Sequence, residues 1–570
     1  MSESAKPSRV MALVRRRPLV LLFLICLLAW VPGLFTIPPL DRDESRFAQA
    51  SKQMLETRNF VDIRFGQEPR YKKPVGIYWL QAAATEIASP VTNGARDQIW
   101  TYRIPSLLGA LAAVALVYWC ASAFLSIEGA FLSALLMGLT LLLSSEAKIA
   151  KTDAVLLATV VGAQAVLMRA YLARDPEHTQ LTFRTAMLGW LSFALGILIK
   201  GPVILGVCGM TLVVLLVWDR EWRWLGKLKP LWGVLLTILI VAPWLIAIAL
   251  QSHGAFYQQS LGHDFGAKLA GGQESHGEPP GYYLLLTIAT LWPATLFVIP
   301  ALAATILQHR APAARFLLAW AGGPWLMFEA VPTKLPHYIM PAYPALAMMA
   351  AAFVLAAREE GLPTWRRVLP VVSSVQFLIG AALLAAAIVV VPRLYGPGAS
   401  WDLIAAAAAV ALLAIAAAFA MLRGAKPMAA ALATATVIVT YPTMTLLAVP
   451  KTDRLWVSPH ETAMIRAHLR PHDPAVVLAG YTEPSAMFLL GTGTHLTNGY
   501  GAAEIGAAQG GLAAVEEGQR PAFLAHLAEL EADAIPIDSI EGFNYSRGRP
   551  VHITLYRVTP PRQETSPPPE

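Results

Sequence analysis

Acidic and basic side chains gather directly after the first long apolar segment of the chain, between residues 40 and 80. A charged side chain so close to lipid is costly unless it has a function. The charged residues that we single out there are Asp43, Glu44, Arg46, Arg70, Lys72 and Lys73. Two acids and one arginine come first, and three basic residues follow about 25 positions later. We predict that these two groups form the two halves of a polar site for an anionic substrate.

The composition indicates an integral membrane protein. Of the 570 residues 56% are hydrophobic and only 14% are charged, and the mean hydropathy is +0.52. In soluble domains the charged residues alone approach about a quarter of the chain. The net charge of +7 comes from short basic clusters between apolar runs, as membrane orientation requires, so we expect no nucleic-acid partner. Cys26, Cys120 and Cys208 lie inside apolar runs and indicate no disulfide framework.

Apolar segments that could span a bilayer recur along the chain. A span needs roughly 20 apolar residues, and we predict about thirteen helical spans. They cover residues 19–35, 104–124, 130–143, 154–172, 186–199, 203–218, 231–250, 282–307, 316–331, 338–357, 369–391, 403–422 and 428–449. Arg15, Arg16 and Arg17 precede the first segment, and no small-residue cleavage site follows it. We therefore expect an uncleaved first span with the N-terminus in the cytoplasm.

The connections between these spans predict an orientation. With the N-terminus inside, one set of connections is short and basic, as cytoplasmic loops are. The other set holds residues 43–73, 144–153, 200–202, 252–280 and 332–338. Every motif with chemistry therefore falls on one side, and we expect the active site on the periplasmic face of a bacterial inner membrane.

From Lys451 onward the composition changes to that of a small soluble α/β domain. Apolar runs shorten to strand length, as in residues 475–479, and alternate with helical stretches such as 521–532. Residues 551–558 predict an edge strand that closes the domain. The predicted fold class is thus an all-α polytopic membrane protein with a small C-terminal α/β domain on the periplasmic side.

We divide the chain accordingly. Residues 1–450 form a transmembrane domain with a catalytic periplasmic loop at 37–103, residues 451–560 form the periplasmic domain, and residues 561–570 form a disordered tail. The chain contains neither a P-loop nor a glycine pattern with the context of a dinucleotide fingerprint. The missing P-loop disfavours ATP-driven transport.

A transferase that works outside the membrane cannot use cytoplasmic nucleotide sugars, so a lipid-linked phosphosugar is the donor that fits. When the sugar departs, negative charge develops on the phosphate, and preorganised lysine or arginine stabilises it. The candidate lysines are Lys72, Lys73, Lys200, Lys268 and Lys334. A carboxylate would accept the proton of the nucleophile, orient the acceptor or bind a metal, and Asp43 is best placed for this.

Five short motifs follow one another along the membrane region. They are Asp43-Glu44-Ser45-Arg46-Phe47-Ala48, Lys73-Pro74 continuing to Tyr78-Trp79, Asp153, His276 in HGEPPGYY, and Lys334-Leu335-Pro336-His337-Tyr338. In this order they resemble the GT-C membrane glycosyltransferases, specifically the lipid A aminoarabinose transferases and the related protein O-mannosyltransferases. The first motif is similar to that family's Asp-Glu-x-Arg-Tyr-Ala, the second to its Lys-Pro-x-x-x-Tyr-Trp and the last to its Lys-Leu-Pro-x-Tyr.

The resemblance implies a GT-C fold and the transfer, with inversion, of one sugar from a polyprenyl-phosphate carrier to lipid A or another envelope glycolipid. It implies the catalytic acids Asp43, Glu44 and Asp153. The substrate-binding residues are then Arg46, Lys72, Lys73, Tyr78, Lys200, Lys268, His276, Lys334, His337 and Tyr338. The aminoarabinose transferases commonly carry Glu where this chain has Lys72. This departure leaves open whether a divalent metal ion takes part, and it leaves room for a more acidic donor such as a uronic acid.

Other interpretations stay open. Asp43 and Asp153 could each cap a helix, and lysines at span ends could simply extend to the membrane surface. Within the enzyme class the alternative is a protein O-mannosyltransferase, although the Arg46-Phe47-Ala48 continuation and the compact outer domain favour lipid A. From another class, a lipid or solute transporter would be expected to show an internal repeat or charges near the middle of the membrane, and the sequence shows neither clearly.

Overall fold

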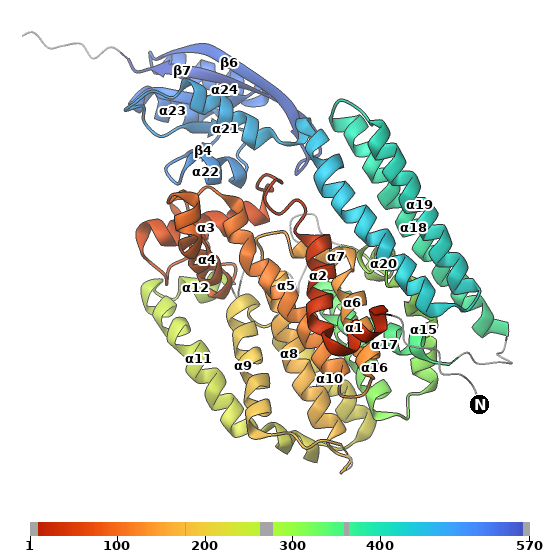
Figure 1. Ribbon diagram of the computed structural model, residues 1–570. Coiled ribbons are helices and arrows are strands. Elements are labelled where there is room, and N and C mark those ends of the chain that lie inside the picture. The colour runs from red at the N-terminus through yellow and green to blue at the C-terminus, as the bar shows by residue number, and fades with distance from the viewer. Residues whose placement is uncertain (1–8, 177, 261, 263–277, 358–363, 562–570) are drawn as a thin grey trace, which may run out of the picture.

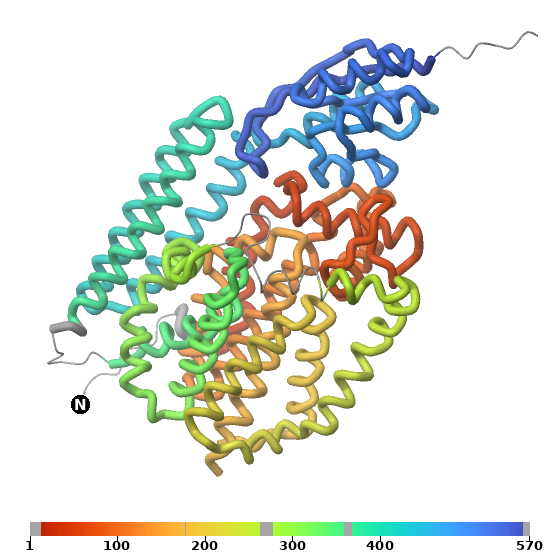
Figure 2. Tube along the Cα trace, turned by 180° about the vertical axis from the view of Figure 1, so that it is seen from behind, coloured from red at the N-terminus to blue at the C-terminus, as the bar shows by residue number. Residues whose placement is uncertain are grey.

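Long apolar helices form a bundle in this computed structural model, and a smaller α/β domain sits over one end of it (Figure 1). The structure describes residues 9–176, 178–260, 262, 278–357 and 364–561. Seen from behind, in Figure 2, the C-terminal domain again lies over the helices of the first loop, which separate it from the bundle. The predicted fold class is confirmed.

All thirteen predicted spans fall on helices of the described part of the chain. Eight helical segments there are long and apolar enough to cross a membrane: Ile99–Ala121 (α5), Asp153–Leu172 (α8), Phe183–Lys200 (α9), Pro230–Gln251 (α11), Pro336–Leu355 (η3, Pro336–Ala342, and α17, Tyr343–Leu355), Arg367–Tyr395 (within α18, Thr364–Tyr395), Trp401–Leu422 (α19) and Lys426–Lys451 (α20, Lys426–Thr443, with η4 and η5). The shorter apolar helices are Pro18–Trp30 (α2), Ile127–Gly138 (α6), Val203–Asp219 (α10) and Thr295–Leu307 (α15). Further elements are α1 (Arg9–Arg16), η1 (Arg223–Leu228), α12 (Ala255–Tyr257) and α16 (Pro312–Ala330).

Two of the predicted spans are each broken into two helices. The segment 130–143 divides into α6 and a short α7, Leu141–Glu146, because Thr140 caps the new helix by accepting the N–H of Leu143. The segment 282–307 divides into α14, Tyr282–Thr290, and α15, since Pro293 between them has no N–H to continue the helix. The first break places Glu146 at the end of a short helix of its own.

The first loop contains two helices and a small hairpin. α3 (Asp43–Thr57) begins with two acidic residues, which the positive end of a helix dipole stabilises. The antiparallel strands β1 (Arg64–Phe65) and β2 (Glu68–Pro69) follow, and then α4 (Gly76–Thr92). In Figure 1 α3 and α4 lie between the bundle and the C-terminal domain. The loop therefore contacts both parts of the protein.

The C-terminal domain is a five-stranded mixed sheet with helices on its faces. Its strand order is β4-β3-β5-β7-β6, with β4, β3 and β5 parallel and β7 and β6 antiparallel. The elements are η6 (Asp453–Leu455), α21 (Val457–His468), β3 (Val477–Ala479), α22 (Pro484–Leu490), β4 (His495–Thr497), α23 (Gly499–Gln509), β5 (Gly511–Glu516), η7 (Glu517–Gln519), α24 (Arg520–Glu529), β6 (Asp533–Asn544) and β7 (Arg549–Thr559). Two apolar clusters pack against the sheet.

The prediction that residues 551–558 form the edge strand is wrong. They belong to β7, which pairs with β5 on one side and with β6 on the other, so the edge is β6. β6 escaped prediction because half of its residues are exposed and because Pro536 lies within it, and proline usually argues against a strand.

Candidate active site

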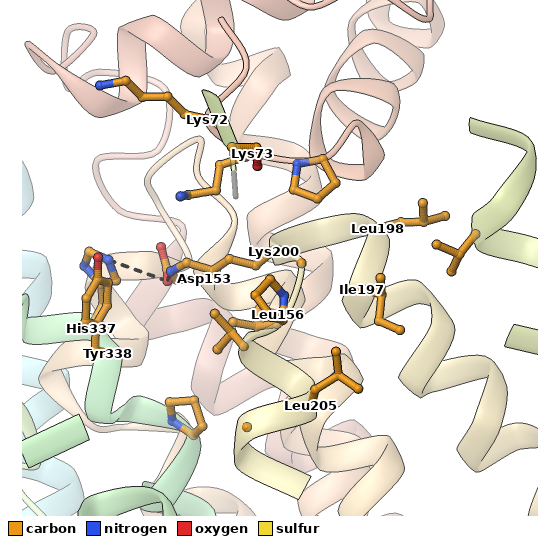
Figure 3. Close-up of a pocket in the computed structure, with 18 of the residues that line it drawn as sticks. Lys72, Lys73, Asp153, Leu156, Ile197, Leu198, Lys200, Leu205, His337 and Tyr338 are labelled. Atoms are coloured by element: carbon orange, nitrogen blue, oxygen red, sulfur yellow. Dashed lines mark hydrogen bonds and ion pairs between the residues drawn. The ribbon is translucent and has the colours of Figure 1, made fainter. Parts of the chain in front are cut away.

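A cavity of about 410 Å³ lies between the first loop and the ends of the bundle helices (Figure 3). Its polar side carries Lys72, Lys73, Asp153, Lys200 and His337. The rest of its wall is mainly apolar and includes Leu156, Ile197, Leu198, Leu205, Val241, Trp244 and Phe328. In Figure 3 the charged side chains gather at the left and centre, Ile197 and Leu198 lie to their right, and Leu156 and Leu205 lie below. A pocket with charge at one end and an apolar wall at the other suits an amphipathic ligand.

Two helix ends and a 3-10 turn bring the central charges together. α8 begins at Asp153, and α9 ends at Lys200 because Gly201, with a φ of +64°, turns the chain. Lys200 Nζ lies 2.5 Å from Asp153 Oδ1, and His337 Nε2 lies 3.8 Å from the same oxygen. The Lys200 ammonium also lies 5.2 Å from the centroid of the Tyr338 ring. These four predicted residues, from three distant parts of the chain, therefore form one cluster.

Glu146 and Lys151 extend this cluster, and neither was predicted. Lys151 Nζ lies 3.0 Å from Glu146 Oε1 and 3.9 Å from Asp153 Oδ2. Burial raises the pKa of Glu146 to about 7, although the charge of Lys151 opposes this rise. Burial alone would lower the pKa of Lys151, but Glu146, Asp153 and Asp43 raise it above its usual range. Two acids that flank two lysines between residues 144 and 153 were the available signal in the sequence.

The same cluster is a poor metal site. Glu146, Asp153 and His337 offer ligand atoms within 4.8 Å of one another, a spacing that a divalent ion could bridge. Lysine ammonium groups, however, already contact both carboxylates, with Lys151 at Glu146 and Lys200 at Asp153. A cation would have to displace these positive charges. The donor set therefore does not fit a metal ion.

The first loop adds basic groups from the opposite side of the cavity. Lys73 and Lys72 both line it, and in Figure 3 the Lys73 side chain extends toward Asp153 whereas that of Lys72 points away from it. Arg46 is half-buried in the first turn of α3, and Asp43 is exposed at the first position of that helix. Of these two lysines, Lys73 is thus the one whose side chain points toward the buried cluster.

Tyr78 lies near Arg70 and Asp43. Tyr78 is fully buried in α4, and its hydroxyl has no hydrogen-bond partner among the described residues. Burial raises the pKa of Tyr78, the nearby Arg70 opposes the rise, and the charge of Asp43 adds to it. Because Asp43 also acts on Lys151, its carboxylate is close enough to influence both sides of the site.

Glu44, predicted as a catalytic acid, lies buried in a network of hydrogen bonds. Its carboxylate, 1% exposed, accepts hydrogen bonds from Arg103 Nε at 2.8 Å and Nη2 at 2.9 Å. It also accepts the N–H of Ala150 at 2.8 Å and that of Leu40 at 2.9 Å. Four donors therefore occupy this carboxylate. The geometry favours a role in joining α3, α5 and the segment before Asp153 rather than a role in proton transfer.

Lys334 is also held by backbone atoms. Its Nζ donates to the carbonyl of Glu278 at 2.8 Å and to that of Val331 at 3.0 Å, and the residue is buried. It does not line the cavity, so the structure places it beside the cavity rather than in it. The other two predicted residues of this region, Lys268 and His276, lie outside the described residues.

Known proteins resemble the chain in sequence over about half of its length. Residues 72–246 match the family model described as dolichyl-phosphate-mannose-protein mannosyltransferase. Two relatives named undecaprenyl phosphate-alpha-4-amino-4-deoxy-L-arabinose arabinosyl transferase, from Aeromonas hydrophila and Erwinia tasmaniensis, are 26% and 27% identical over 340 and 316 residues. These matches cover 57% and 54% of the chain and 59% and 54% of the relatives. The matched part thus spans less than two thirds of either relative.

A solved structure is similar over nearly the whole chain. The crystal structure of ArnT from Cupriavidus metallidurans bound to undecaprenyl phosphate superposes with a TM-score of 0.71 and covers 94% of this chain and 97% of its own, at 18% identity. The chain has the GT-C fold. Because the superposition covers 94% of the chain, the similarity of fold extends well beyond the segment that matches in sequence.

Within this GT-C fold the charged groups of the cavity come from several regions. The matched segment 72–246 supplies Lys72, Lys73, Asp153 and Lys200. His337 follows it by about ninety residues of chain, whereas Asp43 and Arg46, which precede it, do not line the cavity. The sequence therefore identified the charged residues that line the cavity, but the contacts of Glu44 and the presence of Glu146 depend on the fold.

Proposed function

We propose that the chain transfers one sugar from a polyprenyl-phosphate carrier to lipid A at the periplasmic face of the inner membrane. The observation that carries this proposal is the cavity in which Lys73, Lys200 and Asp153 meet an apolar wall. A polyprenyl phosphate has the matching chemistry, a charged head on an apolar chain. The names of the relatives, which specify undecaprenyl phosphate and a pentose, support this choice.

Each charged residue has a role in a single displacement. A hydroxyl or phosphate oxygen of the acceptor attacks the anomeric carbon while the bond between that carbon and the donor phosphate breaks. The electron pair of that bond stays on the phosphate oxygen, where Lys73 and Lys200 stabilise it. Attack from the face opposite the leaving group inverts the configuration. When the attacking oxygen carries a proton, the exposed carboxylate of Asp43 accepts it.

Asp153 and His337 position Lys200 in this scheme. The contact between Asp153 Oδ1 and Lys200 Nζ holds the ammonium group at the cavity, and His337 approaches the same oxygen from another element. Arg103 and Glu44 hold the start of α3, and with it Asp43, against the segment that leads to Asp153. The proposed orientation, with the first loop and the C-terminal domain in the periplasm, follows from the basic connections on the other side.

Mass spectrometry of lipid A from cells with and without the gene tests this function. The expected result is one sugar mass on lipid A that disappears on deletion, returns with the wild-type gene and does not return with Asp43→Asn. Unchanged lipid A together with lost glycosylation of envelope proteins would instead favour a protein mannosyltransferase, the activity in the description of the matching family model. Unchanged lipid A and unchanged protein glycans would contradict both.

A further inference from the structure

A second cavity, of about 670 Å³, lies between the C-terminal domain and the first loop. On one side it is lined by the β1–β2 hairpin, residues 65–68. On the other side it is lined by β4 with the turn before it, residues 492–497, and by residues that follow β3, β4 and β5. Figures 1 and 2 both show the C-terminal domain lying over α3, which precedes this hairpin. The catalytic roles proposed above leave this cavity without a function.

The sheet topology makes this a typical place for a ligand. In the order β4-β3-β5 the chain leaves β3 toward β4 on one side and then crosses to β5 on the other side. Open α/β sheets bind ligands at the carboxyl ends of the strands where the strand order reverses in this way. Gly480 directly after β3 and Gln519 shortly after β5 both line the cavity. At Gly480, with a φ of +88°, a Cβ would lie 2.7 Å from Glu516 Cβ, so glycine is required for the two strand ends to approach.

The lining favours an uncharged polar ligand over an anion. Its charged residues are Glu68 and Arg547, which have opposite signs, whereas four threonines, two glutamines and one asparagine supply hydrogen-bonding groups. The first N–H groups of α23 are already used. Gln519 Oε1 accepts that of Gly499 at 2.8 Å, and Asn498 Oδ1 accepts that of Gly501 at 2.9 Å. These bonds leave the amide NH2 groups of the same two side chains as donors, which suit hydroxyl groups.

The cavity is held open by fixed contacts between the loop and the domain. Thr492 Oγ1 donates to Glu56 Oε2 at 2.6 Å and accepts from Gln49 Nε2 at 2.7 Å, and Lys52 Nζ donates to the carbonyl of Phe488 at 2.9 Å. Three of these five groups, those of Gln49, Lys52 and Glu56, sit on α3, the helix that begins with Asp43. A ligand in the cavity would therefore be held at a fixed position relative to the proposed catalytic carboxylate.

We propose that this cavity is a saccharide-binding site that holds sugar units of the glycolipid acceptor. That the ligand belongs to the acceptor rests on the proposed function, but the saccharide chemistry rests on the cavity alone. The volume is in the range of pockets that enclose small-molecule ligands, roughly 300–1,000 Å³. Phe65, in the hairpin, supplies an aromatic surface against which the apolar face of a sugar ring can pack.

Gly493→Trp tests the site by filling it. A Cβ at Gly493 would meet only Ala475 Cβ, at 3.6 Å, so the substitution brings no clash at its root. Ala528→Trp on the exposed surface of α24 is the matched control, since it adds the same side chain to the same domain away from the cavity. The probe is the dephosphorylated and N-acetylated disaccharide of lipid A, an uncharged oligosaccharide as the lining requires, and its binding to the purified full-length protein is followed by saturation-transfer NMR.

The wild type and Ala528→Trp should bind the oligosaccharide with equal affinity. Gly493→Trp should bind it at least about tenfold more weakly, a loss of about 1.4 kcal/mol in binding free energy. Equal binding by all three proteins, or no binding by the wild type, would overturn the inference. Asp43→Asn separates the two proposals, because it should lose transfer and keep binding. Sugar transfer without saccharide binding would refute only the site, whereas saccharide binding without any transfer by the wild type would refute only the proposed function.

Discussion

Lys200 and Asp153 place opposite charges in contact at the polar end of the cavity. A buried ion pair contributes little to stability by itself, because desolvation offsets most of the attraction, but removing one partner leaves the other charge uncompensated. In the proposed mechanism Asp153 holds Lys200 in place for the donor phosphate. At this scale the account depends on individual charges, and two substitutions test them.

Lys200→Met should reduce sugar transfer by about 100-fold or more, because it removes a positive charge from the leaving phosphate. Lys200→Arg keeps the charge and should retain a measurable rate. Lys227→Met, at an exposed contact with Gln180, is the control for the loss of a lysine and should be neutral. The measurement is the initial rate of transfer by purified protein of equal folded content, and a wild-type rate in Lys200→Met would remove Lys200 from the site.

Glu146→Gln should change how stability depends on pH. Burial raises the pKa of Glu146 from 4.5 to about 7, so the folded state binds this proton more tightly than the unfolded state does. The stabilisation is therefore complete below about pH 4.5 and is lost as the pH rises through about 7. Melting temperatures measured between pH 5 and pH 8 should thus fall more for the wild type than for Glu146→Gln. Parallel curves for the two proteins would show that Glu146 does not titrate in this range.

At the scale of elements, Glu44 and Arg103 join α3 to α5 and to the segment before α8. Both side chains are 1% exposed, and the Arg103 guanidinium also donates to the carbonyls of Leu34, Ile37 and Pro38. One arginine therefore connects the segment between α2 and α3, the start of α3 and its own helix. This network fixes the position of Asp43 without itself lining the cavity.

Glu44→Gln should destabilise the protein by about 3 kcal/mol, because it leaves the buried Arg103 charge without a counter-charge. The transfer rate per folded molecule should change far less than in Asp43→Asn. Glu86→Gln is the control, since Glu86 makes only exposed ion pairs at 3.6 and 3.8 Å, which contribute about 0–1 kcal/mol. Thermal unfolding in detergent and the transfer rate are measured together. An unchanged melting temperature with a lost rate would indicate a catalytic role for Glu44 instead.

The sequence predicted the elements better than the contacts between them. Hydropathy is a local property, so the apolar segments could be identified one by one, but breaks within them, such as those at Thr140 and Pro293, were missed. The pairing of Glu44 with Arg103 joins residues 59 positions apart, and no local pattern marks it. The strand β6 was also missed. Strands are identified by alternating apolar and polar residues, and the exposed residues and the proline of β6 make this alternation irregular.

At the scale of the whole molecule, α3 and α4 of the first loop lie at the end of the bundle next to the C-terminal domain (Figure 1), and the cavity beside this loop carries Lys72, Lys73, Asp153, Lys200 and His337. The orientation proposed from the basic connections places this end outside the cell membrane. Cys26, Cys120 and Cys208 are all buried, so a single introduced cysteine reports on its own surroundings.

Glu86→Cys, in the first loop, should react in intact spheroplasts with a thiol reagent that cannot cross the membrane. Arg223→Cys, in η1 at the other end, should react only after the membrane is permeabilised. Both positions are exposed in the protein, so burial does not explain a lack of labelling. Labelling of residue 223 but not of residue 86 in intact spheroplasts would reverse the proposed topology.

The most direct measurement is sugar transfer by the purified protein in liposomes that contain only a polyprenyl-phosphate-linked sugar and lipid A. The account predicts that mass spectrometry detects lipid A with one added sugar together with an equal amount of free polyprenyl phosphate, and that Asp43→Asn and Lys200→Met form neither. The donor set should include a neutral, an amino and an acidic sugar. Unmodified lipid A with every donor, from protein that is folded and oriented outward, would contradict the account.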